Sequence, residues 1–178
     1  RRQRQMCIRD SDTKEDFMNY MKAASGNGRY GYGGSWEKTY VSNELAQFVN
    51  MFGGDYFDWT NPANKEAVQF MHDLVAEGYT PIDQIADKYE QMNPKANDGK
   101  YGSLFMWGLG TDYAKADMLG EDKIHMAMVP DFSGTGERAI FTDSWNYVLN
   151  SASKNKEAAV KFLQYMASEE GVKASYEA

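Results

Sequence analysis

The stretch NPANKEAVQFMHDLVAEG, from Asn61 to Gly78, carries the clearest structural signal in this 178-residue chain. Asn61 followed by Pro62 is typical of a helix start, as the N-cap and the first helical residue. Gly78 is typical of a helix end. The stretch therefore predicts an amphipathic helix, and its apolar residues recur at the three- and four-residue spacing that places them on one face: Ala67, Phe70, Met71, Leu74 and Val75.

The same kind of pattern extends in both directions along the chain. It predicts helices that begin at residue 13, span 41–52, 81–91 and 111–119, and begin at residues 153 and 168. Asn93-Pro94 is predicted to end the 81–91 helix. Ser153 is predicted to be the N-cap of the helix that begins there. Strands are predicted over 101–107, 123–130 and 139–149. Strands separated by helices of ten or more residues predict the α/β fold class.

Composition excludes several functional classes. The 19 Lys and Arg residues face 26 Asp and Glu, a formal net charge of −7, which argues against a nucleic-acid or anionic-membrane partner bound through a basic surface. No apolar run approaches the roughly 18 residues of a membrane span. The single cysteine, Cys7, excludes an internal disulfide framework and a cysteine-based zinc cluster.

The first 11 residues, RRQRQMCIRDS, differ from the rest of the chain. They contain four arginines and lack helical or strand periodicity, an apolar signal-peptide core and a cleavage site. They resemble the translated adapter sequence found at the ends of assembled sequencing reads. We interpret 1–11 as a foreign or artefactual tail, with a native basic arm as the alternative, and expect the chain to begin inside a longer protein.

No motif in the sequence indicates catalysis. GNGRYG, residues 26–31, matches G-x-G-x-x-G by letter, but a predicted helix precedes it where a dinucleotide site requires a strand. His72 and His125 belong to no metal-binding pattern, and no serine lies in a G-x-S-x-G elbow. We therefore predict no catalytic residue, no metal site and no cofactor.

Aromatic residues are abundant, at 14%, and several lie beside glycine-rich or polar turns. Trp36, Trp107 and Trp145 each stand at the junction of two predicted elements, where α/β folds place ligand-contacting groups. A flat apolar ring next to carboxylates and amides suits a sugar, which offers C–H faces and hydroxyls. Filling of the core is the alternative for each of the three. Trp59, just before a helix cap, is predicted to be a packing residue.

An ordered series of segments resembles a known family. The segments are GRYGYGGSW, FVNMFGGDYFD, NPANKEAVQFMHDLVAEG, DGKYGSLFMWG, VPDF, DSWNYVLN and SKNKEAAVKFLQYMASEEG. Over residues 12–178 the chain is similar to the family 1 extracellular solute-binding proteins of ABC sugar importers, the maltose-binding-protein class. The resemblance implies a periplasmic-binding-protein type 2 fold, two α/β lobes with ligand in the cleft between them. It assigns 12–143 to most of lobe two, the C-terminal lobe, and 144–178 to a crossing strand and helices that return to lobe one.

The resemblance also implies a set of ligand-binding positions. Aromatic residues would stack on the sugar or wall the cleft, and polar residues would bond its hydroxyls. The segment Gly108-Leu109-Gly110 departs from the order usual around the cleft tryptophan of the family, and Arg138 is a weaker candidate. The implied stacking, polar and wall positions are Trp36, Glu37, Tyr40, Asn43, Trp107, Asp143 and Trp145.

On this basis we expect an extracytoplasmic binding protein, periplasmic or a cell-surface lipoprotein, that binds a carbohydrate without chemistry. It would deliver the sugar to the transmembrane subunits of an ABC permease, and the full-length protein would be a monomer. We do not expect this fragment alone to bind ligand as a stable monomer. Two alternatives remain: a carbohydrate-active enzyme module, or a solute-binding protein for a non-sugar ligand such as a polyamine or a phosphodiester.

Overall fold

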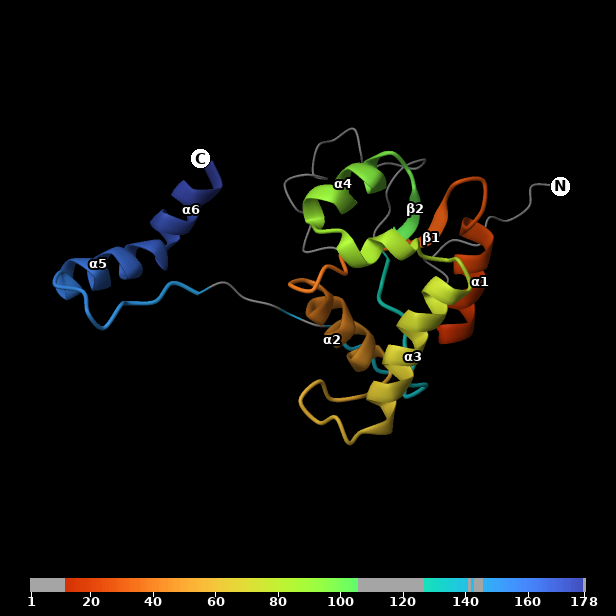
Figure 1. The fold of residues 1–178 in the computed structure, drawn as a ribbon. Coiled ribbons are helices and arrows are strands. Elements are labelled where there is room, and N and C mark those ends of the chain that lie inside the picture. The colour runs from red at the N-terminus through yellow and green to blue at the C-terminus, as the bar shows by residue number, and fades with distance from the viewer. Residues whose placement is uncertain (1–11, 106–126, 141, 143–145, 178) are drawn as a thin grey trace. The chain divides into compact units, whose positions relative to one another are not determined.

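A computed structural model describes residues 12–105, 127–140, 142 and 146–177 (Figure 1). The predicted helix over 111–119 lies outside these residues, as do Trp107, Asp143 and Trp145. The chain divides into two compact units, with the boundary between residues 141 and 142.

In the part of the first unit that the structure describes, helices surround two short strands, as Figure 1 shows. These strands lie far apart in the sequence, and three helices and a 3₁₀ helix connect them. In chain order the elements are α1 (Lys14–Ala24), β1 (Tyr30–Gly33), α2 (Val41–Met51), α3 (Pro62–Ala76), the 3₁₀ helix η2 (Ile82–Ala86), α4 (Tyr89–Asn97) and β2 (Tyr101–Leu104).

The two strands pair in parallel, with Tyr30 opposite Tyr101 and Gly33 opposite Leu104. Parallel pairing needs a long crossover, and the segment from α2 to α4 supplies it. Helix α1 packs so closely on β1 that a side chain at Gly31 would place its Cβ 2.5 Å from the carbonyl oxygen of Met21. A mixed α/β unit with a small parallel sheet confirms the predicted fold class.

The core of this unit forms where α1, α2 and α3 meet the strands. Asn61 is the N-cap of α3, as the sequence predicts, and its side chain accepts from the Ala63 N–H. Phe132, from the segment that returns past α1, packs its ring against Phe70 at 5.2 Å. The buried side chains of the cluster are Phe17, Met21, Tyr32, Trp36, Phe48, Val49, Met51, Phe52, Ala67, Phe70, Met71 and Leu74.

The single helix predicted over 81–91 is wrong. The chain forms η2, opens at Asp87 into an extended conformation (φ −79°, ψ 130°) and starts α4 at Tyr89. The reason is tertiary: the Asp87 carbonyl accepts from the loop after β1 and cannot serve a continuous helix. Pro94 does not end α4 either, since the helix continues to Asn97.

The second unit contains α5 (Lys156–Met166) and α6 (Glu169–Glu177). Ser153 is not the cap of α5: its hydroxyl accepts from the Asn155 N–H, and Asn155 occupies the N-cap position. No residue of α5 is buried, and Phe162 of the predicted stripe is 56% exposed. The described residues within 123–130 and 139–149 do not form the predicted strands.

Candidate functional site

The carboxyl ends of β1 and β2 lie side by side because the strands are parallel. In open α/β sheets, ligands bind outside the carboxyl ends of the strands. β1 is followed by the segment from Gly34 to Tyr40, which leads into α2 and contains three of the predicted binding residues. This edge of the sheet is therefore the candidate site.

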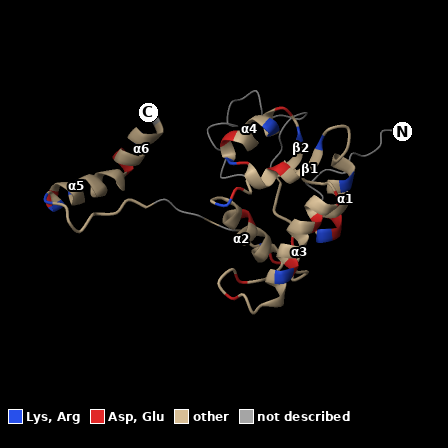
Figure 2. Ribbon diagram, viewed as in Figure 1, with Lys and Arg blue, Asp and Glu red and all other residues tan. Residues whose placement is uncertain are grey.

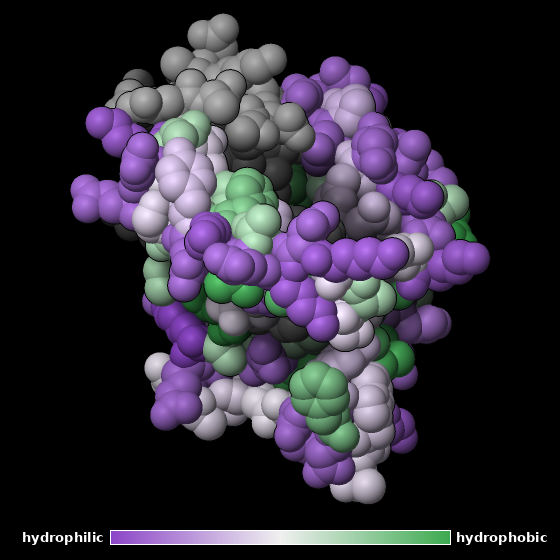
Figure 3. Space-filling model, turned by 90° about the vertical axis from the view of Figure 1, so that its left-hand side faces the viewer, coloured by the Kyte–Doolittle hydropathy of each residue, from purple (hydrophilic) through white to green (hydrophobic). Residues whose placement is uncertain are grey.

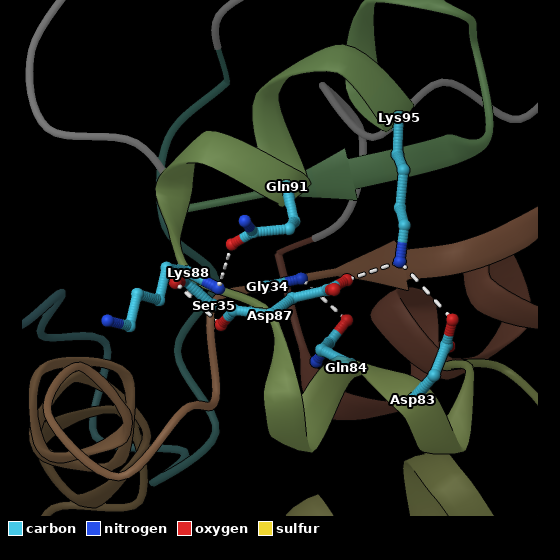
Figure 4. Close-up of polar contacts among 8 residues, drawn as sticks. All are labelled: Gly34, Ser35, Asp83, Gln84, Asp87, Lys88, Gln91 and Lys95. Atoms are coloured by element: carbon cyan, nitrogen blue, oxygen red, sulfur yellow. Dashed lines mark hydrogen bonds and ion pairs between the residues drawn. The ribbon is translucent and has the colours of Figure 1, made fainter.

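One side of the segment is fastened to η2 and the residue after it (Figure 4). The Gly34 N–H donates to Gln84 Oε1 at 2.7 Å, and the Trp36 N–H donates to the Gln84 carbonyl at 3.2 Å. The Glu37 N–H donates to the Asp87 carbonyl at 3.1 Å. Gln84 is fully buried, and it accepts hydrogen bonds from the first part of the segment through both its side chain and its backbone carbonyl.

The other side of the segment is fastened to the buried carboxylate of Glu44, in the first turns of α2. The Ser35 N–H donates to Oε1 at 2.8 Å, while the Trp36 indole N–H, at 2.8 Å, and the Tyr32 hydroxyl both donate to Oε2. Burial raises the pKa of Glu44, and the three donors act against that shift. Burial, and then the Glu44 charge, also raises the pKa of Tyr32 well above its usual value.

An ion pair holds the η2 side in place. Lys95 of α4 donates to Asp87 at 2.5 Å and to Asp83 at 3.3 Å, and Figure 4 shows it reaching down from α4 between the two carboxylates. Burial alone would lower the pKa of Lys95, but the bonds to the carboxylates outweigh it and raise the pKa. Burial also raises the pKa of the neighbouring Tyr101 to about 12. The segment after β1 is thus held from α2, η2 and α4 together.

The structure separates the predicted residues into different environments. Trp36 is 7% exposed and joins the core, the alternative that the sequence left open for it; contact with ligand stays a prediction. Glu37 and Tyr40 are half-buried, and the Tyr40 ring meets Tyr89 of α4 edge to face at 4.7 Å. Asn43 instead lines a hollow between α2 and the loop that follows it.

Glu44, Gln84 and Asp87 were not predicted from the sequence. A signal for Glu44 exists: it stands four residues before Phe48, on the apolar face of the predicted 41–52 helix, where a carboxylate is buried only if it is hydrogen-bonded. The sequence gives no such signal for Gln84. Apolar pattern favours burial of the isoleucines at positions 82 and 85, yet both are exposed and Gln84 is buried. Its burial follows from contacts with β1, which lies 50 residues earlier.

Residues 10–173 match the family model described as bacterial extracellular solute-binding protein. The chain belongs to this family. Comparison with curated proteins and with solved structures finds no significant match. The small parallel sheet and its helices are consistent with part of a periplasmic-binding-protein fold.

Members of this family are the non-catalytic solute-binding components of ABC importers, so the enzyme alternative is set aside. Among the described residues, no group of three His, Cys, Asp or Glu side chains could hold a metal ion. No helix in the part of the chain that the structure describes is long and apolar enough to cross a membrane. Basic and acidic positions are interspersed along the helices (Figure 2).

Two hollows of the described surface lie apart from the hydrogen bonds of this candidate site. One, of about 350 Å³, lies between α2 and the loop that follows it, and Asn43 lines it. The other, of about 530 Å³, lies at the start of α1 and includes Asp131 and Arg138. Hydrogen bonds from Ser133, Gly134 and Gly136 lower the pKa of Asp131, and Arg138 is committed to an ion pair with Asp12 and to the Val129 carbonyl. Asp131 and Arg138 in the second hollow are therefore already bonded within the chain.

Proposed function

We propose that this solute-binding protein binds a carbohydrate outside the cytoplasm and delivers it to the transmembrane subunits of an ABC permease. Aromatic rings would stack on the sugar and polar groups would bond its hydroxyls. The sugar would lie in the cleft between the two lobes of the family fold. We assign 12–143 to most of lobe two, and 144–178 to a crossing strand and helices that return to lobe one. The proposed ligand residues are Trp36, Glu37, Tyr40, Asn43, Trp107, Asp143 and Trp145.

The observation that carries the proposal is the pairing of a half-buried aromatic ring with a carboxylate at the carboxyl edge of the sheet. Tyr40 stands against Tyr89, so its ring is held in one orientation. The Thr39 N–H donates to Glu37 at 2.9 Å and lowers the pKa of that carboxyl, which therefore stays ionised and can accept bonds from sugar hydroxyls.

Delivery requires that the ligand favour one conformation of the protein. A sugar that contacts both lobes stabilises the closed state by its differential affinity for that state. A pocket that reads hydroxyls through polar groups should reject an analogue that lacks one of them, because the unmatched group then stays unpaired. The closed, loaded form would be the one that the permease recognises.

Calorimetric titration of the full-length protein with mono- and oligosaccharides tests the ligand class. We expect saturable binding of at least one sugar, and none of spermidine. Binding of spermidine alone, or of a phosphodiester alone, would overturn the carbohydrate proposal.

The ring at Tyr40 is tested by a matched pair of variants. Tyr40→Ala removes the stacking surface and should weaken sugar binding about tenfold or more, the equivalent of about 1.4 kcal/mol. Tyr40→Phe keeps the ring and should bind within about threefold of the parent. Equal affinity of all three proteins would exclude Tyr40 from the ligand contacts.

A further inference from the structure

The turn between α1 and β1 contains an asparagine followed by a glycine, Asn27-Gly28. We propose that this pair is a modification site, at which Asn27 deamidates spontaneously, through a succinimide, to aspartate and isoaspartate. The inference is independent of the proposed carbohydrate function, because the reaction needs only water and the two residues themselves. It assigns a chemistry to a surface turn that takes no part in the candidate site.

The reaction joins the side chain of Asn27 to the backbone nitrogen of Gly28. The Gly28 N–H gives its proton to a base, and the nitrogen attacks Cγ of Asn27. The bond from Cγ to the side-chain nitrogen breaks, and that nitrogen leaves with the proton as ammonia. Water then opens the succinimide ring on either side of the Gly28 nitrogen. Cleavage of its bond to Cγ gives aspartate, and cleavage of its bond to the backbone carbonyl carbon gives isoaspartate. The sum is one water consumed and one ammonia released, without oxidation or reduction.

Both reacting groups are accessible in the structure. Asn27 and Gly28 are exposed, and neither the Asn27 side chain nor the Gly28 N–H forms a hydrogen bond with another described residue. Apart from the chain neighbours, no described atom lies within 4 Å of the position that a Cβ at Gly28 would take. The nucleophile and the carboxamide that it attacks are therefore open to water and to base.

Exposure alone does not single out an asparagine, since hydrophilic residues cover much of the face shown in Figure 3. Asn97, Asn150 and Asn155 are exposed as well. They are followed by aspartate, serine and lysine, whose side chains crowd the attacking nitrogen, whereas Gly28 has no side chain and its backbone is the least restricted. In the whole sequence, Asn27 is the one asparagine that precedes a glycine.

The folded turn slows the reaction, because it holds the two groups in an unsuitable geometry. Asn27 (φ 54°) and Gly28 (φ 78°) both lie in the left-handed region. The backbones of Gly26 and Arg29 exchange two hydrogen bonds of 3.0 Å. This is the pattern of a type I′ turn, in which ψ of the first central residue is roughly 30°. At that angle the Gly28 nitrogen points away from the Asn27 side chain, so the turn must open before the ring can close.

Opening of the turn requires the loss of only the two hydrogen bonds between Gly26 and Arg29. The tip of an exposed turn opens locally at a small cost in free energy while the rest of the protein stays folded. At the base of the turn, the Ser25 hydroxyl donates to the Met21 carbonyl at 2.8 Å and accepts from the Gly31 N–H at 2.9 Å. The tip can therefore open while α1 and β1 remain joined.

The two products differ in their effect on the turn. Aspartate keeps the length of the backbone and, like asparagine, tolerates the left-handed conformation, so the turn re-forms with an added negative charge. Isoaspartate inserts a methylene into the backbone, which no longer matches the spacing of the bonds between Gly26 and Arg29. The change stays at the amino end of β1, where the Tyr30 N–H donates to the Lys100 carbonyl at 2.8 Å, and the candidate site lies at the carboxyl end.

Peptide mapping by mass spectrometry of the full-length protein, incubated at mildly alkaline pH, tests the proposal. Chromatography separates the aspartate and isoaspartate peptides. We expect the peptide that contains Asn27 to convert at least about threefold faster than the one that contains Asn150, an exposed asparagine followed by serine. Conversion should accelerate with rising pH, because base removes the Gly28 proton. It should also accelerate several-fold in guanidinium chloride, because the unfolded chain has no turn to open.

Two variants complete the test. Asn27→Gln should abolish the conversion at this position, because its longer side chain would have to close a larger and less favourable ring. Asn27→Asp is the aspartate product in pure form, and its melting temperature should lie within about 2 °C of that of the parent. Conversion of Asn27 no faster than that of Asn150 in the folded protein would overturn the proposal. Equal rates for Asn27 with and without guanidinium chloride would overturn the protective role of the turn.

Discussion

Trp36 and Trp59 stand in similar places: each lies in a loop that leads into a helix of the first unit. Their surroundings differ sharply. Trp36 is 7% exposed in the core, whereas Trp59 is 55% exposed and contacts the ring of Tyr56 edge to face. The same residue type thus serves as a structural anchor in one loop and as a surface ring in the other.

The difference comes from the polar partners of each loop. A buried indole needs an acceptor for its N–H, and Glu44 supplies one to Trp36 at 2.8 Å. The backbone amides around Trp36 are bonded to buried groups on Gln84 and Asp87, which draws the loop inward. The loop around Trp59, which we name the aromatic loop (residues 55–60), bonds mainly within itself, as in the contact of the Thr60 N–H with the Asp58 carboxylate at 3.0 Å. Of these two tryptophans, the buried one is therefore the one whose neighbouring backbone N–H groups have buried hydrogen-bond partners.

The largest effect is expected at Trp36. Trp36→Ala should lower the free energy of unfolding by about 3–5 kcal/mol, because it leaves a cavity beside Tyr32 and removes one donor from Glu44. Trp36→Phe keeps most of the volume and should cost less, which separates packing from the hydrogen bond. Urea unfolding measures both. A loss below about 1 kcal/mol for the alanine variant would contradict the buried anchor.

A smaller loss is expected at Gln84, where the anchor meets η2. Gln84→Ala leaves the buried Gly34 N–H without its acceptor, which should cost about 1–3 kcal/mol. The control Ile85→Ala changes the adjacent residue, which is 57% exposed, and should stay within about 0.5 kcal/mol of the parent. Thermal or urea unfolding measures the free energy of unfolding of both variants. Equal losses would show that the hydrogen bond to the Gly34 N–H does not contribute to stability.

The carboxylate that anchors Trp36 should make stability depend on pH. Burial raises the pKa of Glu44 in the folded state above its unfolded value of about 4.3. The folded protein then holds this proton at pH values where the unfolded chain has lost it, so stability falls as pH rises from about 4 through the raised pKa.

Glu44→Gln keeps the volume and removes the titration. The unfolding free energy of the parent, minus that of the variant, should fall over this pH range by at most about 1.4 kcal/mol per pH unit, and be constant at higher pH. Urea unfolding from pH 4 to 8 provides the comparison. A difference independent of pH would mean that the three donors around Glu44 cancel the effect of its burial.

Local pattern was sufficient to predict most helices, because caps and apolar spacing act within a few residues. The prediction for α3 was confirmed from its N-cap to its buried stripe. Helix α5 has a very similar sequence, with Asn-Lys-Glu-Ala at its start, yet buries no residue. Apolar spacing gives the face of a helix that can be buried, but the partner that buries it depends on segments elsewhere in the chain.

The site was less accessible to prediction for the same reason. Glu37 and Tyr40 were proposed as ligand residues through the family resemblance, and in the structure they follow β1; contact with ligand stays a prediction. The partners that hold them, Glu44 and Gln84, come from separate elements and form contacts that no spacing reveals. Trp59 was predicted to be a packing residue, which is wrong, because its loop bonds to itself and to Asn64 and leaves the ring outside.

The smallest effect on stability is therefore expected at Trp59 itself. Trp59→Ala removes a ring that is 55% exposed, so the free energy of unfolding should change by no more than about 0.5 kcal/mol. Urea unfolding of the variant and of the parent measures this change. A stability loss as large as that of Trp36→Ala would remove the contrast between the two loops, because it would mean that the Trp59 ring is buried in solution.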